Sequence, residues 1–269
     1  MAEAAINGAL AAVNGVTLAY DDTGGDGPVV VLAHGFLMDR TMFDDQVEAL
    51  RGAYRVVCWD ARGFGDTVYD DQPFTYWDSA RDCLALMDHL GIDRAVVGGM
   101  SQGGFVALRA ALLAPERVRA LILLDTQAGP EDAEVIPFYQ GMVDQWVANG
   151  PSDDLADATA ALILGEPTLS ASWTAMWKSR PQESLRNPGR TLLERESIAD
   201  RLGEITVPVL VVHGTADVSI SMDKAEALAA GLVGCSGVVV VEGGTHAANM
   251  THPGAVNEAV VGFLAGLPA

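Results

Sequence analysis

Residues 95–114, AVVGGMSQGGFVALRAALLA, decide the fold, and Gly99-Met100-Ser101-Gln102-Gly103 lies at their centre. The apolar residues 95–98 are typical of a short buried strand, and 102–114 has the spacing of a helix. Between them, the pentapeptide fits G-x-S-x-G, in which a serine occupies a sharp turn from strand to helix. That turn presses the residues two before and two after the serine against each other, so glycine is expected at both. The pattern therefore places the Ser101 hydroxyl at a sheet edge, beside the unpaired N–H groups that begin a helix.

Short apolar runs rich in Val or Leu recur along the chain and alternate with segments of helical spacing. The runs lie at 29–33, 55–59, 121–124, 209–213 and 238–242, and the helical segments lie at 41–51, 75–90, 222–232 and 253–265. Asn14-Gly15 separates two β-prone halves of residues 11–20 and predicts an antiparallel hairpin. The alternation predicts an α/β fold whose strands are buried in a mostly parallel sheet with helices on both faces.

Residues 126–206 break this alternation, because they contain no strand-like run and are helix-prone and punctuated by proline. We therefore expect a core formed by 1–125 and 207–269, with 126–206 inserted as a helical lid. The insertion leaves and rejoins the sheet at the carboxyl edge, so it should lie over the crevice there. Trp146 and Trp177 are predicted to contact substrate from this lid, and the alternative is that they pack its helices onto the core.

Composition excludes several classes of partner. The chain has 269 residues, 49% of them apolar, and a formal net charge of -20, with 36 acidic against 16 basic residues. Such a field repels nucleic acid and anionic membranes, and no basic leader or uninterrupted run of 18 apolar residues predicts a signal peptide or membrane span. The chain has three cysteines, an odd number, at Cys58, Cys83 and Cys235. They lack metal-ligand spacing and are expected to be buried, reduced thiols of a cytoplasmic protein. The sequence leaves open whether the protein forms a homo-oligomer.

A serine hydroxyl becomes nucleophilic when a base removes its proton and a carboxylate orients that base. Asp217 follows the predicted strand 209–213, and His246 follows 238–242. Loops at the carboxyl ends of parallel strands gather in one crevice, where Ser101 is also expected. We therefore predict Ser101 as nucleophile, Asp217 as acid and His246 as base, an order in the chain that is typical of one fold.

In these features the chain resembles the α/β-hydrolase family from Gly15 to its C-terminus. The shared motifs are His34-Gly35, Asp60-x-Arg62-Gly63-x-Gly65, the Ser101 turn, His-Gly-x-x-Asp at 213–217 and Gly-x-His at 244–246. The resemblance implies the α/β-hydrolase fold and, within it, the serine hydrolase branch that contains carboxylesterases and enol-lactonases. It also implies that the backbone N–H groups of Phe36 and Gln102 form an oxyanion hole.

Other polar residues compete for roles in the site. Asp125, at the end of 121–124, is the rival acid, because some members of the family place the carboxylate there. His34 is expected to brace the oxyanion loop and His213 to be structural. The remaining expectations are that His89 and His252 lie outside the site and that Asp60 and Arg62 form a structural ion pair or cap a turn.

These residues predict acyl transfer to water, that is, hydrolysis of a small carboxylic ester or lactone as the small-molecule substrate. No cluster has metal-ligand spacing, so neither a metal nor another cofactor is expected. Perhydrolases or haloperoxidases without a cofactor, carbon-carbon bond hydrolases and hydroxynitrile lyases use the same triad and remain alternatives. A small-molecule receptor that signals by closing its lid is the alternative of a different class. The acidic lid predicts preference for neutral over dianionic acyl groups.

Overall fold

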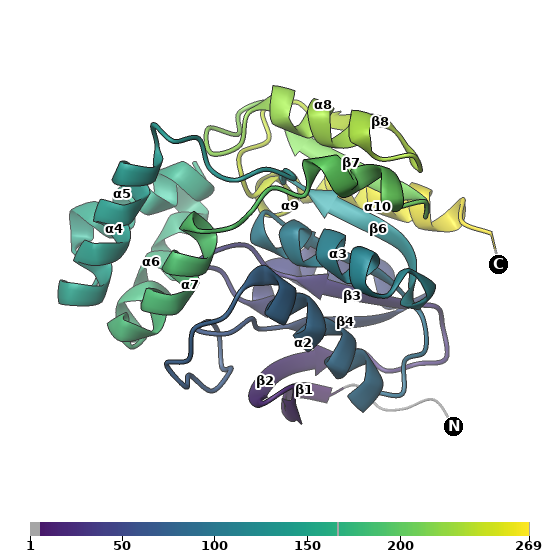
Figure 1. Cartoon of the computed structure of the whole chain (residues 1–269), viewed down its shortest axis with the longest axis horizontal. Helices are drawn as coiled ribbons and strands as arrows, with labels where there is room; N and C mark the ends of the chain where they lie inside the picture. The colour runs from purple at the N-terminus through teal and green to yellow at the C-terminus, as the bar shows by residue number, and fades with distance from the viewer. Residues whose placement is uncertain (1–5, 166, 269) are drawn as a thin grey trace.

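The computed structural model describes residues 6–165 and 167–268 and contains one eight-stranded sheet in the order β1-β2-β4-β3-β5-β6-β7-β8 (Figure 1). From β3 onward the strands are parallel, and β1 and β2 join antiparallel at one edge. The strands are β1 Ile6–Val13, β2 Val16–Asp22, β3 Val29–Ala33, β4 Arg55–Trp59, β5 Ala95–Met100, β6 Val118–Leu124, β7 Val209–Gly214 and β8 Cys235–Val241. The expected α/β-hydrolase fold is confirmed.

The N-terminal hairpin forms where Asn14-Gly15 predicted it. Asn14 has φ 46° and Gly15 has φ 79°, so both residues of the turn are left-handed. A two-residue turn with this geometry matches the right-handed twist of the strands that it joins, and Val13 pairs with Val16 directly beside it.

Helices cover both faces of the sheet, as the alternating pattern predicted. Helices α2, α3 and α8 lie in front of it in Figure 1, and α10 lies behind, where α1 contacts α10. The predicted helix at 41–51 is divided into a short 3-10 helix, Arg40–Phe43, and α1. The helices of the core are α1 Asp44–Leu50, α2 Tyr76–His89, α3 Gln102–Leu113, α8 Met222–Gly231, α9 Ala248–Thr251 and α10 Pro253–Ala265.

Strand β8 departs from the expectation of burial. Val239 is 41% exposed and Val240 is 54% exposed, because β8 is an edge strand with a neighbour on one side only. A run of valines favours an extended strand but does not say how many strands or helices will cover it. For the same reason Cys235, at the start of β8, is half-buried, whereas Cys58 and Cys83 are buried free thiols as predicted.

The segment between β6 and β7 forms helices α4 Ile136–Asn149, α5 Asp153–Ile163, α6 Pro167–Ser179 and α7 Arg186–Leu193. Its described residues, 126–165 and 167–206, contain no strand. These helices gather at one end of the sheet, on the left in Figure 1, toward which the β6 arrow points. Because β6 and β7 are parallel, this segment leaves the sheet at the carboxyl end of β6 but re-enters it at the amino end of β7. The expectation that both its ends lie at the carboxyl edge is therefore wrong. The division of the chain into a core and a lid remains a prediction.

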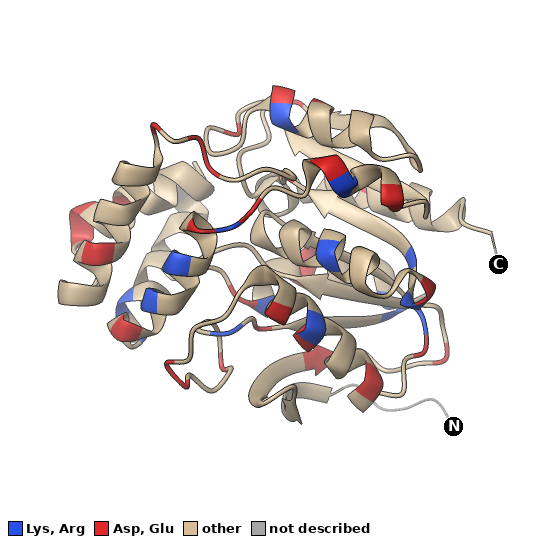
Figure 2. Ribbon diagram, in the orientation of Figure 1, with Lys and Arg blue, Asp and Glu red and all other residues tan. Residues whose placement is uncertain are grey.

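Charged residues are distributed over the helices and loops and are sparse on the strands (Figure 2). No helix in the described part of the chain is both long and apolar enough to cross a membrane.

Candidate active site

The turn after β5 holds Ser101 in a strained conformation. Ser101 has φ 50° and ψ -112°, a region that residues other than glycine rarely adopt. A Cβ at Gly99 would lie 2.5 Å from the carbonyl carbon of Gly103, and a Cβ at Gly103 would overlap the carbonyl oxygen of Ala33. Both glycines are therefore required for the close packing that the sequence predicted.

The predicted acid and base contact each other. His246 Nδ1 lies 2.8 Å from Asp217 Oδ2, while Asp217 Oδ1 accepts hydrogen bonds from the backbone N–H groups of Ser219, at 2.8 Å, and Ile220, at 2.9 Å. An ionised carboxylate can only accept a hydrogen bond, so Nδ1 carries the hydrogen that it donates to Asp217, and Nε2 has a free lone pair. His246 and Ser101 line the same cavity. The arrangement can thus transfer a proton from a hydroxyl to the ring.

The environment of Asp217 favours its charged form. Burial by itself raises the pKa of this carboxyl, but the adjacent His246 ring and the backbone N–H of Ile220 outweigh it, so the net pKa is lowered. An ionised carboxylate is what the base needs, since it stabilises the imidazolium that forms during proton transfer.

Asp125 has a different environment, although it ends the neighbouring strand. Its carboxylate accepts hydrogen bonds from the backbone N–H groups of Gly214, at 2.9 Å, and Ala248, at 3.3 Å. Burial, with a contribution from the Asp217 charge, raises the pKa of Asp125 well above its ordinary value and favours the neutral acid. The geometry and the charge both favour Asp217 over Asp125 as partner of His246.

The predicted oxyanion donors lie at the start of α3 and on the loop after β3. Gln102 is the first residue of α3, so its backbone N–H has no acceptor within the helix. Phe36 lies on the loop after β3 and lines the cavity with Ser101. His34 braces this loop: its Nδ1 lies 2.7 Å from the Gly35 carbonyl oxygen and its Nε2 accepts from the Ala61 N–H at 2.9 Å. Burial lowers the pKa of His34, which suits a neutral bracing ring.

Comparison with known proteins decides the family. A model of the alpha/beta hydrolase fold matches residues 28–253. The chain belongs to the α/β-hydrolase family. Its structure is similar to that of an esterase from Thermogutta terrifontis, with a TM-score of 0.87 and 29% identity over 99% of this chain and 100% of the other. An enol-lactonase from Burkholderia xenovorans LB400 gives a TM-score of 0.86 and 28% identity over 96% and 100%.

A sequence relative of this hydrolase comes from Synechocystis sp. and has a provisional name as a non-heme chloroperoxidase. It is 29% identical over 275 residues, which cover 93% of this chain and 95% of the relative. Together with the family match, these relatives support a hydrolase of this fold.

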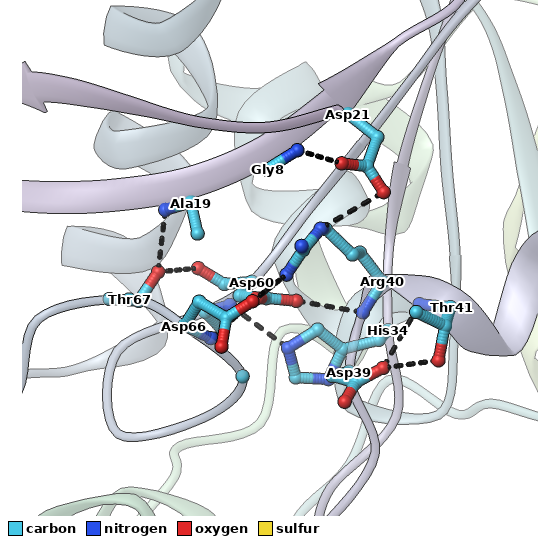
Figure 3. A network of polar contacts seen from close by, with 12 residues as sticks. Gly8, Ala19, Asp21, His34, Asp39, Arg40, Thr41, Asp60, Asp66 and Thr67 are labelled. Carbon is cyan, nitrogen blue, oxygen red and sulfur yellow. Dashed lines mark hydrogen bonds and ion pairs between the residues drawn. The ribbon is translucent and has the colours of Figure 1, made fainter. Parts of the chain in front are cut away.

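An ionic network that is buried at Asp60 and exposed at Asp66 supports the loops around the hydrolase site (Figure 3). Asp60 accepts hydrogen bonds from the backbone N–H and guanidinium of Arg40, and from the backbone N–H of Asp66. Arg62 pairs instead with Asp82, at 2.6 Å. Asp60 and Arg62 therefore have the structural roles that the motif suggested, but each has a separate partner and they do not pair with each other.

The cavity at Ser101 has a volume of about 50 Å³ and is mostly apolar. It is lined by Phe36, Leu37, Ser101, Glu131, Tyr139, Met142, Thr159, Leu162, Ile163, Leu192, Ser219, Ile220 and His246. Glu131 is the acidic residue among these lining residues, and Arg195 pairs with it at 2.9 Å. Sequence reasoning missed Glu131, because acidic residues are frequent in this segment and no local pattern sets this one apart.

Trp146 and Trp177 are absent from the cavity lining. Their side chains are buried, 4% and 2% exposed, and the ring centroids lie 6.0 Å apart at an interplanar angle of 65°. This is an edge-to-face packing pair. The structure therefore favours the packing alternative over the predicted substrate contacts of these two residues.

The remaining histidines lie outside the cavity lining. His213 Nε2 lies 2.8 Å from the Ile220 carbonyl oxygen, so His213 holds the loop that carries Asp217, a structural role. His89 packs against Tyr20, and His252 precedes α10. Asp125, His213 and Asp217 form a compact cluster of possible ligand atoms, but each already has a hydrogen-bond partner in the protein.

Proposed function

We propose that this protein is a serine hydrolase that cleaves small, neutral carboxylic esters or lactones through an acyl-enzyme on Ser101. The proposal is carried by the hydrogen bond between His246 and Asp217, whose other carboxylate oxygen accepts two backbone N–H groups. His246 and Ser101 line the same cavity. A strained nucleophile turn supports it, since such strain concentrates at functional sites.

In the first step Ser101 Oγ bonds to the carbonyl carbon of the substrate, and its proton passes to His246 Nε2. The carbonyl oxygen becomes an oxyanion, which the N–H groups of Phe36 and Gln102 stabilise. The carbon-oxygen bond to the alcohol then breaks, and His246 returns the proton to the leaving alkoxide. Water attacks the acyl-enzyme by the same route, and the carboxylic acid and free Ser101 result.

We also propose that the helices between β6 and β7 form a lid over the site. Tyr139 and Met142 of α4, Leu162 of α5 and Leu192 of α7 all line the cavity. These side chains shape the acyl pocket from the side opposite the sheet, and their apolar character suits a short acyl chain.

Steady turnover of p-nitrophenyl acetate and butyrate tests the function itself. We expect continuous release of nitrophenol with many turnovers per protein molecule, because water can reach the acyl-enzyme. A single burst equal to the protein concentration, followed by no further release, would instead identify a receptor that is acylated but does not turn over.

Acid should inactivate the enzyme by protonating a single group, His246. Protonated His246 cannot accept the proton of Ser101, whereas the lowered pKa of Asp217 keeps that carboxylate charged as the pH falls. We expect kcat/KM for a neutral ester to fall on acidification with the slope of a single protonation. The measurement runs from about pH 5 to pH 8, with circular dichroism to show that the fold persists. A flat profile would remove His246 as the base.

Glu131 should select against anionic substrates. Glu131 lines the cavity and its paired Arg195 does not, so an acyl group with its own carboxylate would meet like charge there. We expect higher kcat/KM for p-nitrophenyl butyrate than for mono-p-nitrophenyl succinate. Glu131→Gln should lower the ratio of kcat/KM for the butyrate to kcat/KM for the succinate about tenfold or more. The variant leaves the Arg195 charge uncompensated beside the cavity, which favours the anionic substrate.

Glu134→Gln is the matched control for this change, since Glu134 is exposed on the same segment and does not line the cavity. It should leave the ratio of the two substrates unchanged. A parent enzyme that prefers the succinate monoester, or equal ratios in the parent and Glu131→Gln, would contradict the role of Glu131.

Haloperoxidase activity without a cofactor, by way of perhydrolysis, is a second candidate function, since the Synechocystis relative bears the name of a non-heme chloroperoxidase. It would use the same acyl-enzyme, with hydrogen peroxide replacing water as the acceptor and a peracid replacing the acid as product. Comparing peracid and carboxylic acid formation in the presence of acetate ester and peroxide distinguishes the two.

A further inference from the structure

The loop after β3 carries the oxyanion donor and contains a strained residue. Leu37 follows Phe36 directly and has φ 66°, in the left-handed region that residues with a side chain disfavour. A turn with a hydrogen bond from the Met38 N–H to the Gly35 carbonyl, at 3.1 Å, closes this part of the loop. Something must hold the loop in this conformation, since the local backbone preference opposes it.

Trp177 of α6 contacts the loop at the strained residue. Its indole N–H donates a hydrogen bond to the Leu37 carbonyl oxygen, at 2.6 Å, in a buried environment. The Trp146 ring packs edge-to-face on Trp177 and fixes its orientation. A buried hydrogen bond is costly to lose, because the carbonyl would be left without water or another donor.

Arg180, just after α6, makes a second connection to the same loop. Its guanidinium donates to Asp39 Oδ2, at 3.0 Å, and to the Gly65 carbonyl oxygen. Asp39 in turn accepts from the backbone N–H of Thr41 and caps the 3-10 helix that follows the loop (Figure 3). None of the described residues of α6 lines the cavity at Ser101. Helix α6 therefore contacts the oxyanion loop and not the substrate cavity.

We infer that Trp177 is a positioning residue, which with Arg180 holds the Phe36–Leu37 loop so that the Phe36 N–H points at the developing oxyanion. The inference rests on the proposed function. It assigns α6 a role in the chemical step, although the helix belongs to the inserted segment and its side chains do not line the cavity. Misplacing an oxyanion donor weakens binding of the transition state more than binding of the substrate, so kcat should change and KM should not.

Trp177→Phe removes the indole N–H and keeps an aromatic ring, and Trp173→Phe is the matched control. Trp173 lies one turn earlier on α6 and is 8% exposed, and among the described residues its indole N–H donates no hydrogen bond to the loop. For p-nitrophenyl acetate we expect Trp177→Phe to lower kcat about tenfold with KM within about twofold of the parent. Trp173→Phe should match the parent in both parameters.

Inhibition by an aryl trifluoromethyl ketone distinguishes positioning of the oxyanion donor from a merely structural role, which would leave the inhibition constant unchanged. Ser101 Oγ adds to the ketone carbon, His246 takes the proton, and the ketone oxygen becomes an oxyanion that models the transition state. Its inhibition constant should rise in Trp177→Phe by the same factor by which kcat falls. Equal kcat and equal inhibition constants in Trp177→Phe and Trp173→Phe would overturn the inference.

Arg180→Met keeps the test decisive if Trp177→Phe does not fold, because Arg180 is partly exposed and methionine preserves its stem. It should lower kcat several-fold with KM unchanged, and an unchanged kcat in the folded variant would overturn the inference. A parent enzyme with no ester turnover and no fluorophosphonate labelling of Ser101 is a different result, because it rejects the proposed function itself.

Discussion

Ser101→Ala is expected to lower kcat for p-nitrophenyl acetate by about four to six orders of magnitude, because no other group at the turn can form the acyl-enzyme. A fluorophosphonate probe should add its mass to the peptide that contains Ser101 in the parent and to none in the variant. Ser101 is 6% exposed and only its oxygen is lost, so the variant should remain folded by circular dichroism.

Ser219 provides the matched control, since it is a second serine on the wall of the same cavity. Its backbone N–H, which donates to Asp217, is unaffected by replacement of the side chain. Ser219→Ala should therefore retain labelling at Ser101. Labelling at Ser219 in the parent, or a fully active Ser101→Ala variant, would reject the nucleophile.

Asp217→Asn should lower kcat by about four orders of magnitude. Asp217 Oδ1 accepts two backbone N–H bonds, so the amide oxygen of asparagine would occupy that position and the NH2 group would face His246 Nδ1. The ring would then accept at Nδ1 and carry its hydrogen on Nε2, where it cannot take the Ser101 proton. Asparagine also removes the charge that stabilises the imidazolium.

Asp125→Asn should act mainly on stability and leave kcat within about tenfold of the parent. Asp125 accepts hydrogen bonds from the backbone N–H groups of Gly214 and Ala248 and makes none with His246. Its raised pKa already favours the neutral acid. Melting temperature and kcat measured for both variants decide the assignment. A larger loss of kcat in Asp125→Asn than in Asp217→Asn would move the acid to Asp125.

Much of the fold could be predicted because its signals are local. Asn14-Gly15 tolerates a left-handed turn, and Gly99 and Gly103 permit a strand-to-helix turn that a Cβ would block. Alternation of apolar runs and helical spacing placed the parallel strands within a few residues of their observed bounds. The chain order of Ser101, Asp217 and His246 then sufficed to predict which loops should meet.

Contacts between distant segments could not be predicted in the same way. Arg62 has carboxylates near it in the chain, but its partner is Asp82 on α2. Glu131 is one of many acids in its segment, and its place in the cavity depends on how that segment folds back over β6 and β7. An ion pair or a cavity wall depends on distances in space, which residue spacing along the chain does not encode.

The sequence by itself determined an alternating α/β architecture and the glycine-flanked turn at Ser101, because backbone sterics and periodicity are properties of short segments. The resemblance to α/β-hydrolases, carried by the motifs at 213–217 and 244–246, implied the loops from which the proposed acid and base come. Only the tertiary structure decided that Asp217 and not Asp125 contacts His246, since both end adjacent strands and differ in the direction of their side chains. It also decided that Trp146 and Trp177 pack on each other and that Trp177 contacts the oxyanion loop. A buried indole ring satisfies its N–H with whichever carbonyl the packing brings near, and that choice is made only when the helices meet the core.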